Sequence, residues 1–396
     1  MPILDLDGDS IFKYYDYISM GSRLFCDQTL IKNFTNALSK NILLNPKARE
    51  YPDLITFGYY CRQASITRIQ ESLIDLGHRC GRGTVLHIAP ANIPINFAFS
   101  FLMGFLSGNS NIIRLPTKIY PQTELLIYLI DILLEKNEFK ELNQQILFVK
   151  SNHNSATLLE IISKANGLII WGGDSTIERF KNLKKPIQCV EIYFPNRISS
   201  AVFCAKSLIA LDDEKLSKLC EKFYNDTYLV DQNACSSPNL IFWIGSDQEC
   251  NKAKKIFWNA MRLLLNDKYS LDPVARIDKC LDVMKFNEKF KKTAIITHHS
   301  SNIWLTSNHK LVENNGRYGM FAEIKIQKTS QLFDYLRPNE QTLTYFGLDA
   351  LELFEKSKSK ISSLDRIVPM GNALNIGMHW DGKNIIEILA KKIEVQ

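Results

Sequence analysis

Cys235 is the residue whose type and setting best suit it to act as a nucleophile. It lies in the polar run DQNACSSP (residues 231–238), between a helical pattern and a buried strand pattern, and its nearest neighbours are small. Catalytic groups are often carried on a loop that a rigid frame positions, and a thiolate attacks carbonyl carbon. A cysteine is also a common small apolar core residue, so the local sequence leaves both interpretations open.

Asn92 is the second candidate, because a fixed side-chain amide can hold a negatively charged oxygen. It follows a strand pattern, precedes an apolar helical pattern, and is flanked by Pro90 and Pro94. An amide at a strand end could donate to the oxyanion of an acyl-transfer intermediate. Asparagine is equally a preferred helix N-cap, and the local sequence favours that structural role.

The segment Gly172-Gly173-Asp174-Ser175-Thr176 is a candidate for cofactor binding. Glycines let a backbone approach a phosphate closely, and the N-terminus of a helix favours anions. The segment is not a GxGxxG fingerprint, however. A tight turn with Asp174 or Ser175 as the N-cap is the alternative, and the pattern alone favours this alternative.

Two cations, Arg114 and Lys118, follow another strand pattern and are further candidates for cofactor binding. Cations at the carboxyl end of a strand can meet ribose or phosphate, although solvated surface charges fit the pattern equally well. His153, His298 and His299 have no partner spacing typical of zinc. The sequence has no HExxH, Walker or GxSxG motif, which argues against metalloprotease, P-loop and α/β-hydrolase functions.

Strand and helix patterns alternate around these candidates. The predicted strands cover residues 84–89, 111–115, 145–150, 167–171, 186–192 and 240–244. The predicted helices cover residues 64–76, 94–106, 122–136, 156–164 and 213–228, with a short helix from 175. This alternation predicts an α/β fold with crossover units on a parallel sheet, which binds ligands at the carboxyl ends of its strands. Residues 1–60 have a mixed pattern that predicts no clear element.

The composition of the 396 residues is that of an ordinary globular protein, with 45% apolar and 23% charged residues. The net charge of +6 is spread along the chain, which argues against nucleic acid as a partner but suits phosphate-rich ligands such as coenzyme A and dinucleotides. The nine cysteines form no CxxC pair, so we expect no disulfide framework and no metal. We expect a cytoplasmic protein, because there is no signal-peptide core and the most apolar run is shorter than the ~20 residues of a membrane span.

Taken together, the motifs resemble the bacterial acyl-CoA reductases of the LuxC type, which belong to the aldehyde dehydrogenase superfamily. The motifs are residues 87–100, continuing through 108–111, then 231–238, and at the C-terminus 365–371 and 380–382. The resemblance covers residue 80 to the end. It implies an aldehyde dehydrogenase-like fold with a parallel-sheet dinucleotide-binding domain and a second, α/β catalytic domain. We expect the first to comprise residues 1–197 with 350–396 returning to it, and the second to comprise 198–349.

The resemblance also implies roles for individual residues. Cys235 would carry the acyl group, with the Asn92 amide and the backbone N–H of Cys235 as oxyanion donors. Residues 171–176 would lie near the nicotinamide nucleotide, and residues 114–118 near the adenosine ribose, although the spacing departs there from the family pattern. Glu191 falls roughly where hydrolytic relatives keep a base, but the following residues lack the usual two glycines.

The resemblance therefore implies NADPH-dependent reduction of an acyl-CoA, of the fatty acyl type, to the aldehyde through a thioester on Cys235. NADH is the alternative cofactor, and we expect a homo-oligomer that works with acyl-transfer partner proteins. Two other functions stay open. One is an aldehyde dehydrogenase that makes free acid with Glu191 as the base, and the other is an accessory acyl-binding protein with the same fold.

Overall fold

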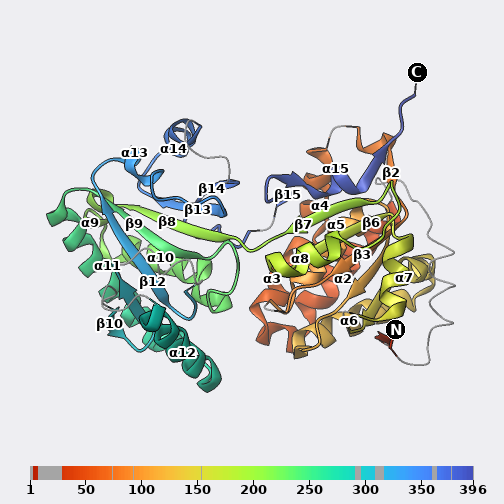
Figure 1. Cartoon of the computed structure of the whole chain (residues 1–396), viewed down its shortest axis with the longest axis horizontal. Coiled ribbons are helices and arrows are strands. Elements are labelled where there is room, and N and C mark those ends of the chain that lie inside the picture. The colour runs from red at the N-terminus through yellow and green to blue at the C-terminus, as the bar shows by residue number, and fades with distance from the viewer. Residues whose placement is uncertain are drawn as a thin grey trace. The chain divides into compact units, whose positions relative to one another are not determined.

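The computed structural model describes residues 3–7, 29–73, 75–91, 93–152, 154–289, 296–307, 316–358, 364–375 and 377–395. The chain divides into two compact units. Met1–Pro195 and Ile376–Gln396 form unit 1, and Asn196–Asn375 form unit 2 (Figure 1). Each unit is built on its own sheet, which confirms the α/β class that the alternating pattern predicts.

Unit 1 contains a six-stranded parallel sheet with the order β1-β5-β4-β3-β6-β7. Its strands are β1 (Leu4–Asp5), β3 (Thr84–Ile88), β4 (Ser110–Arg114), β5 (Ile146–Lys150), β6 (Gly167–Trp171) and β7 (Val190–Phe194). The order reverses between β3 and β6, because β4 and β5 continue on one side of β3 while β7 continues on the other side of β6. In such sheets a ligand binds outside the carboxyl ends of the strands at this reversal point.

Helices cover both faces of this sheet (Figure 1). One face packs against α2 (Thr29–Leu44), α3 (Pro52–Tyr60), α4 (Gln63–Glu71), α5 (Asn96–Leu106), α6 (Pro121–Leu134) and α15 (Ile385–Leu389). The other face packs against α7 (Ala156–Lys164) and α8 (Asp174–Lys181). Short 3-10 helices are η1 (Lys47–Glu50), η2 (Leu76–His78) and η3 (Asn137–Gln145).

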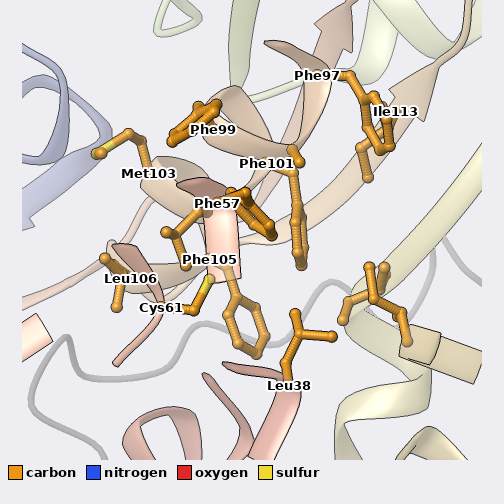
Figure 2. Packing of buried hydrophobic residues seen from close by; sticks show 14 of the residues in the cluster. Leu38, Phe57, Cys61, Phe97, Phe99, Phe101, Met103, Phe105, Leu106 and Ile113 are labelled. Carbon is orange, nitrogen blue, oxygen red and sulfur yellow. The ribbon is translucent and has the colours of Figure 1, made fainter. Parts of the chain in front are cut away.

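Helix α5 is the apolar centre of the first face. Its residues 97–106 are all buried, as expected for a helix that is apolar on every side. Figure 2 shows the rings of Phe101 and Phe105 in the same cluster as Phe57 of α3. The ring centroids of Phe101 and Phe105 lie 5.4 Å apart. This packing fixes the position of the helix that follows β3, beside the reversal point of the sheet.

The C-terminal residues return to unit 1 in small strands. β17 (Ala390–Lys392) pairs with β2 (Arg79–Gly81), and β15 (His379–Trp380) pairs with β16 (Lys383–Asn384). The sequence analysis predicts that the chain returns to the first domain at about residue 350. In the structure it begins at Ile376, because the preceding strand still pairs within unit 2.

Unit 2 contains a seven-stranded sheet with the order β10-β11-β12-β9-β8-β13-β14, in which only the β10–β11 pair is antiparallel. The strands are β8 (Ile198–Cys204), β9 (Pro238–Ile244), β10 (Ile296–Ser300), β11 (Ile303–Thr306), β12 (Met320–Ile326), β13 (Glu340–Phe346) and β14 (Arg366–Pro369). The helices are α9 (Ala205–Ile209), α10 (Asp213–Asp226), η4 (Tyr228–Val230), α11 (Asp247–Lys268), α12 (Pro273–Lys289), α13 (Thr329–Leu332) and α14 (Ala350–Ser357). One face of the sheet packs on α9, α10 and α11, and the other on α13 and α14.

Helix α11 begins with a capping motif that the local sequence encodes. Ser246 caps it, accepting a hydrogen bond from Glu249 N while the Glu249 carboxylate accepts one from Ser246 N. This reciprocal capping satisfies two backbone donors that the first turn would otherwise leave exposed. In the described ranges, no helix combines the length and the apolar character needed to cross a membrane.

Candidate functional site

The loop that carries Cys235 connects η4 to β9, and its first two residues have an unusual backbone conformation. Asp231 has φ +52° and Gln232 has φ +58°, so two consecutive residues with side chains adopt the left-handed conformation. This conformation is uncommon outside glycine and costs free energy of about 1–3 kcal/mol per residue. The surrounding contacts must therefore hold the loop in this shape.

The side chain of Gln232 provides much of that support. Its Nε2 donates to the carbonyls of Pro238 (3.0 Å) and Met320 (3.1 Å). Its Oε1 accepts from the amides of Gly319 (3.0 Å) and Met320 (3.2 Å). The amide is buried, so all four bonds form away from water. Gln232 thereby ties the start of the Cys235 loop to its end and to the start of β12.

Cys235 itself is half-buried and lies at the amino end of β9. Ser199 Oγ of β8 donates to the backbone carbonyl of Cys235 at 2.7 Å and accepts from Thr342 N of β13 at 3.2 Å. Ser199 is in register with Pro238, which explains how a residue far away in the sequence reaches the loop. The thiol therefore sits on a backbone that two neighbouring strands restrain.

A second layer of contacts supports the loop from the other side. Asp231 accepts from Tyr269 Oη at 2.7 Å, and burial raises the pKa of its carboxyl. Tyr318 N donates to Asp231 O at 3.2 Å. The carbonyl of Tyr318 in turn accepts from the buried Lys279 Nζ at 2.7 Å, and Lys279 also donates to Ser301 O at 3.2 Å. Burial lowers the pKa of Lys279 to about 7.

Asn92 lies outside the described residues. The residues on either side of it are anchored to the start of α6. Tyr120 Oη donates to Ala91 O at 3.3 Å, and Thr123 Oγ1 donates to Pro94 O at 3.0 Å. These contacts hold the turn between β3 and α5 at the reversal point of the sheet.

The Gly172-Gly173 turn lies at the carboxyl end of β6, on the other side of the same reversal point. Gly173 is exposed, is the N-cap of α8, and a Cβ atom added there would meet nothing within 4 Å. Asp174, Ser175 and Thr176 form the first turn of α8, where backbone amides have no carbonyl of the helix to bond. The turn can therefore accept an anion close to its backbone, although the exposed Asp174 carboxylate adds negative charge beside it.

The two cations are placed differently. Arg114 is 4% exposed and donates to Ser151 O at 2.7 Å and Ser151 Oγ at 3.2 Å. Burial lowers the pKa of Arg114. Its guanidinium therefore stabilises the end of β5 in this structure. Lys118 is exposed, with Nζ 4.7 Å from the centroid of the Tyr120 ring.

Glu191 lies near the amino end of β7, away from the carboxyl ends of the strands. Its side chain is partly exposed and forms an ion pair with Lys185 at 2.9 Å. Tyr193 Oη donates a hydrogen bond to the same carboxylate oxygen. These contacts give Glu191 a structural role at the edge of the sheet.

The sequence analysis did not identify three groups that support the Cys235 loop: Ser199, the side chain of Gln232, and Lys279. Gln232 lies within the predicted motif, and its left-handed backbone, three residues before Cys235, is a feature that only the coordinates reveal. No motif and no predicted element includes Ser199 or Lys279, so the sequence has no signal for their contacts. Among the described residues, no group of three or more His, Cys, Asp or Glu side chains could hold a metal ion.

Comparisons with known proteins agree with this arrangement. Residues 65–391 match the family model described as acyl-CoA reductase (LuxC). A long-chain acyl-protein thioester reductase from Vibrio harveyi is 22% identical over 317 residues, which cover 77% of this chain and 63% of that protein. The chain thus spans less than two thirds of the length of this relative. The resemblance inferred from the motifs is confirmed.

Solved structures show the same fold at low sequence identity. A lactaldehyde dehydrogenase matches 97% of this chain and 91% of its own, with a TM-score of 0.66 at 12% identity. Betaine aldehyde dehydrogenase from Staphylococcus aureus, solved in complex with NAD+, matches 96% of this chain and 85% of its own, with a TM-score of 0.64 at 11% identity. Proline utilization A from Corynebacterium freiburgense reaches a TM-score of 0.69 at 10% identity, with 100% of this chain covering 44% of that one. The fold is therefore that of the aldehyde dehydrogenases, as the motifs predict.

Proposed function

The chain belongs to the acyl-CoA reductase (LuxC) family, and from this membership we propose that it reduces an acyl thioester to an aldehyde, with Cys235 as the acyl carrier and NADPH as the reductant. The observation that carries the proposal is the setting of Cys235. Its thiol is half-buried on a loop that Gln232 and Ser199 restrain with hydrogen bonds. A nucleophile held in this way keeps one geometry as the bond forms.

The acyl transfer follows from the chemistry of the thiol. The Cys235 thiolate attacks the acyl carbonyl, the oxyanion collapses, and the thiolate of the donor leaves. The Asn92 amide is proposed as the oxyanion donor, the kind of group whose removal commonly costs about 3 kcal/mol of barrier height. The product is an acyl group in thioester linkage to Cys235. A reduced nicotinamide dinucleotide, when bound, supplies the hydride that converts this thioester to the aldehyde and restores the thiolate.

The turn after β6 fits a dinucleotide phosphate. Gly173 leaves open space where a side chain would stand, and the first amides of α8 point outward from the helix end. We propose that residues 172–176 contact the cofactor and that the exposed Lys118 contacts its ribose or phosphate. Arg114 is the weaker cofactor candidate, because its guanidinium already bonds to Ser151.

The acyl donor is proposed to be a fatty acyl-CoA or an acylated protein. The name of the Vibrio harveyi relative refers to an acyl-protein thioester, which supports acyl-transfer proteins as partners. We also propose a cytoplasmic homo-oligomer, as the composition and the family suggest. The apolar residues of α5 are buried in the core of unit 1, so we do not propose them as a binding surface for the acyl chain.

An acylation assay tests the proposal directly. The protein is incubated with acetyl-, octanoyl- or palmitoyl-CoA without cofactor, and an acyl adduct on Cys235 is sought by peptide mass spectrometry. NADPH is then added, and its absorbance and the aldehyde product are followed. We expect the Cys235→Ala variant to lose adduct and turnover by more than about a thousandfold. The matched control is Cys204→Ala, which removes another half-buried cysteine of unit 2.

The outcomes separate the three functions. An adduct with NADPH consumption supports the reductase. An adduct that NADPH and NADH both leave unchanged indicates an accessory acyl-binding protein. NAD-dependent oxidation of an aldehyde to free acid, with no acylation by acyl-CoA, indicates the dehydrogenase. Full activity in Cys235→Ala would exclude the covalent mechanism.

A further inference from the structure

A buried chain of hydrogen bonds ends on the indole of Trp171, the residue before Gly172. The indole Nε1 donates to Ser100 Oγ at 3.0 Å, and Ser100 Oγ lies 2.8 Å from His87 Nδ1. His87 Nε2 lies 2.9 Å from Asn111 Oδ1. Ser100, His87 and Asn111 are at most 2% exposed. Side chains from β3, β4 and α5 thus form one network beneath the carboxyl end of β6.

The position of each proton in this network follows from its ends. Asn111 Nδ2 donates to Asn109 O at 2.7 Å, so Oδ1 faces His87 and can only accept. His87 Nε2 must therefore carry a hydrogen. Burial lowers the pKa of His87 to about 4, so the ring is neutral and its Nδ1 accepts from the Ser100 hydroxyl. The Ser100 oxygen is then oriented to accept the indole N–H of Trp171.

The packing of α5 leaves room for the network at one position. A Cβ atom added to Gly104 would lie 2.1 Å from Asn111 Oδ1 and 2.9 Å from His87 Nε2. These distances are shorter than atoms tolerate, so a side chain at residue 104 would displace the hydrogen-bonded pair. Gly104 therefore lets the helix approach closely enough for Ser100 to join β3 to β6.

The indole that the network holds lies in an aromatic cluster. The ring of Trp171 stacks on Phe194 of β7, with centroids 3.9 Å apart and planes inclined by 20°. Trp380 lies 6.4 Å away, centroid to centroid. The ammonium of Lys383 lies 5.8 Å from the centroid of Phe194. Trp171 is only half-buried, and it directly precedes the Gly172 turn.

The C-terminal motif builds the rest of this cluster. Asp381 (φ +48°) and Gly382 (φ +68°) form the two-residue turn of the β15–β16 hairpin. Two left-handed residues match the twist of a tight hairpin. The turn places Trp380 on one strand and Lys383 on the other, so the hairpin contributes both a ring and a cation to the cluster around Trp171.

We propose that Trp171 is a cofactor-contacting residue, and that Ser100 and His87 are positioning residues that fix its indole for contact with a planar ring of the dinucleotide. This inference rests on the proposed function. The arrangement combines a half-buried indole, a nearby cation and an anion-accepting turn, which are the features that a ring joined to phosphates needs. The network and the stacked Phe194 hold the indole in one rotamer, which lowers the entropy cost of binding.

The test measures NADPH binding to the full chain by calorimetry and by quenching of tryptophan fluorescence. The variants are Trp171→Phe, Ser100→Ala and the double variant. The control is Ser107→Ala, because Ser107 is also buried on α5 and its hydroxyl donates to Met103 O at 2.6 Å instead. Acylation of Cys235 in the absence of cofactor is measured in every variant, because a general loss of folding would lower it too.

We expect Trp171→Phe to lose most of the NADPH-dependent quenching. Ser100→Ala should raise the Kd for NADPH about tenfold, the effect of one lost hydrogen bond, while Ser107→Ala and cofactor-free acylation stay unchanged. In the Trp171→Phe background, Ser100→Ala should add nothing, because the donor it serves is gone.

Two results would overturn this inference but leave the proposed function intact. They are undiminished quenching in Trp171→Phe, and an equal effect of Ser100→Ala in both backgrounds. If the wild-type protein binds neither NADPH nor NADH, the proposed function fails, and the inference fails with it.

Discussion

The hydroxyl of Ser199 donates a hydrogen bond to the carbonyl oxygen of Cys235 at 2.7 Å. Cys235 lies in the loop before β9, and the pairing of β8 with β9, which sets Ser199 opposite Pro238, brings Ser199 close to that loop. The same hydroxyl accepts from Thr342 N, so one buried side chain joins three neighbouring segments of the sheet. The orientation of the proposed nucleophile thus depends on a residue that takes no part in the chemistry.

Replacing Ser199 by alanine should therefore affect both stability and acylation. The change leaves a buried carbonyl and a buried amide without their partner, which costs about 1–3 kcal/mol of unfolding free energy. We expect acylation of Cys235 to slow about tenfold, because the loop loses one restraint. Urea unfolding and the rate of adduct formation measure the two effects.

Ser200→Ala is the matched control for this prediction. Ser200 is equally buried and adjacent, but its hydroxyl bonds to Glu340 rather than to the Cys235 loop. We expect a loss of stability without a change in the acylation rate of the folded protein. Equal rates in Ser199→Ala and wild type would contradict the restraint.

Replacing Gln232 by glutamate tests the clamp on the loop. The shape of the side chain is kept, but a carboxylate would face the carbonyls of Pro238 and Met320, which now accept from Nε2. Two buried donors are lost and a charge is buried, so we expect the unfolding free energy to fall by about 3 kcal/mol or more at neutral pH. Chemical unfolding at neutral pH measures this, and a loss below ~1 kcal/mol would argue that the clamp contributes little.

Lys279→Met tests the pH dependence of the support beneath the loop. Burial lowers the pKa of Lys279 from 10.5 to about 7, so above pH 7 the unfolded chain binds more protons at this residue than the folded chain. Stability then rises with pH between 7 and 10.5 because of this group, and the penalty of burying the charge is fully present below pH 7. We expect the wild-type protein to gain stability relative to Lys279→Met as pH rises through this window.

Thermal unfolding of both proteins across that pH range measures the difference. Lys252→Met, which removes an exposed lysine of α11, serves as the control and should follow the wild-type curve. A constant difference between wild type and Lys279→Met at all pH values would contradict the lowered pKa. The loss of the bonds to Tyr318 and Ser301 should add a pH-independent loss of stability.

Glu191→Gln separates reduction from aldehyde oxidation. The carboxylate lies near the surface and is bound by Lys185 and Tyr193, so we expect acyl-CoA reduction to change by less than about twofold. Glu160→Gln, which removes another surface ion pair, is the control. A selective loss of aldehyde oxidation to acid in Glu191→Gln would instead identify Glu191 as a catalytic base.

The local sequence contained enough information for the α/β class and for many element bounds. The helix predicted at 156–164 and the strand predicted at 167–171 match α7 and β6 to the residue. Both have clear apolar periodicity and are bounded by turn-forming residues, which act within a few positions of each other. Residues 1–60 gave no clear prediction, although α2 and α3 lie there, because their helical character depends on packing against α5 and α6.

The candidate nucleophile and the family were both inferred from motifs, since short runs such as residues 231–238 stay together in any fold. Only the tertiary structure decided which side chains surround them. It joined Ser199 to Cys235, joined His87 through Ser100 to Trp171, and turned Arg114 toward Ser151. These contacts depend on the order in which parallel strands lie side by side. That order is set by crossover connections and long-range packing, and no local pattern of residues specifies it.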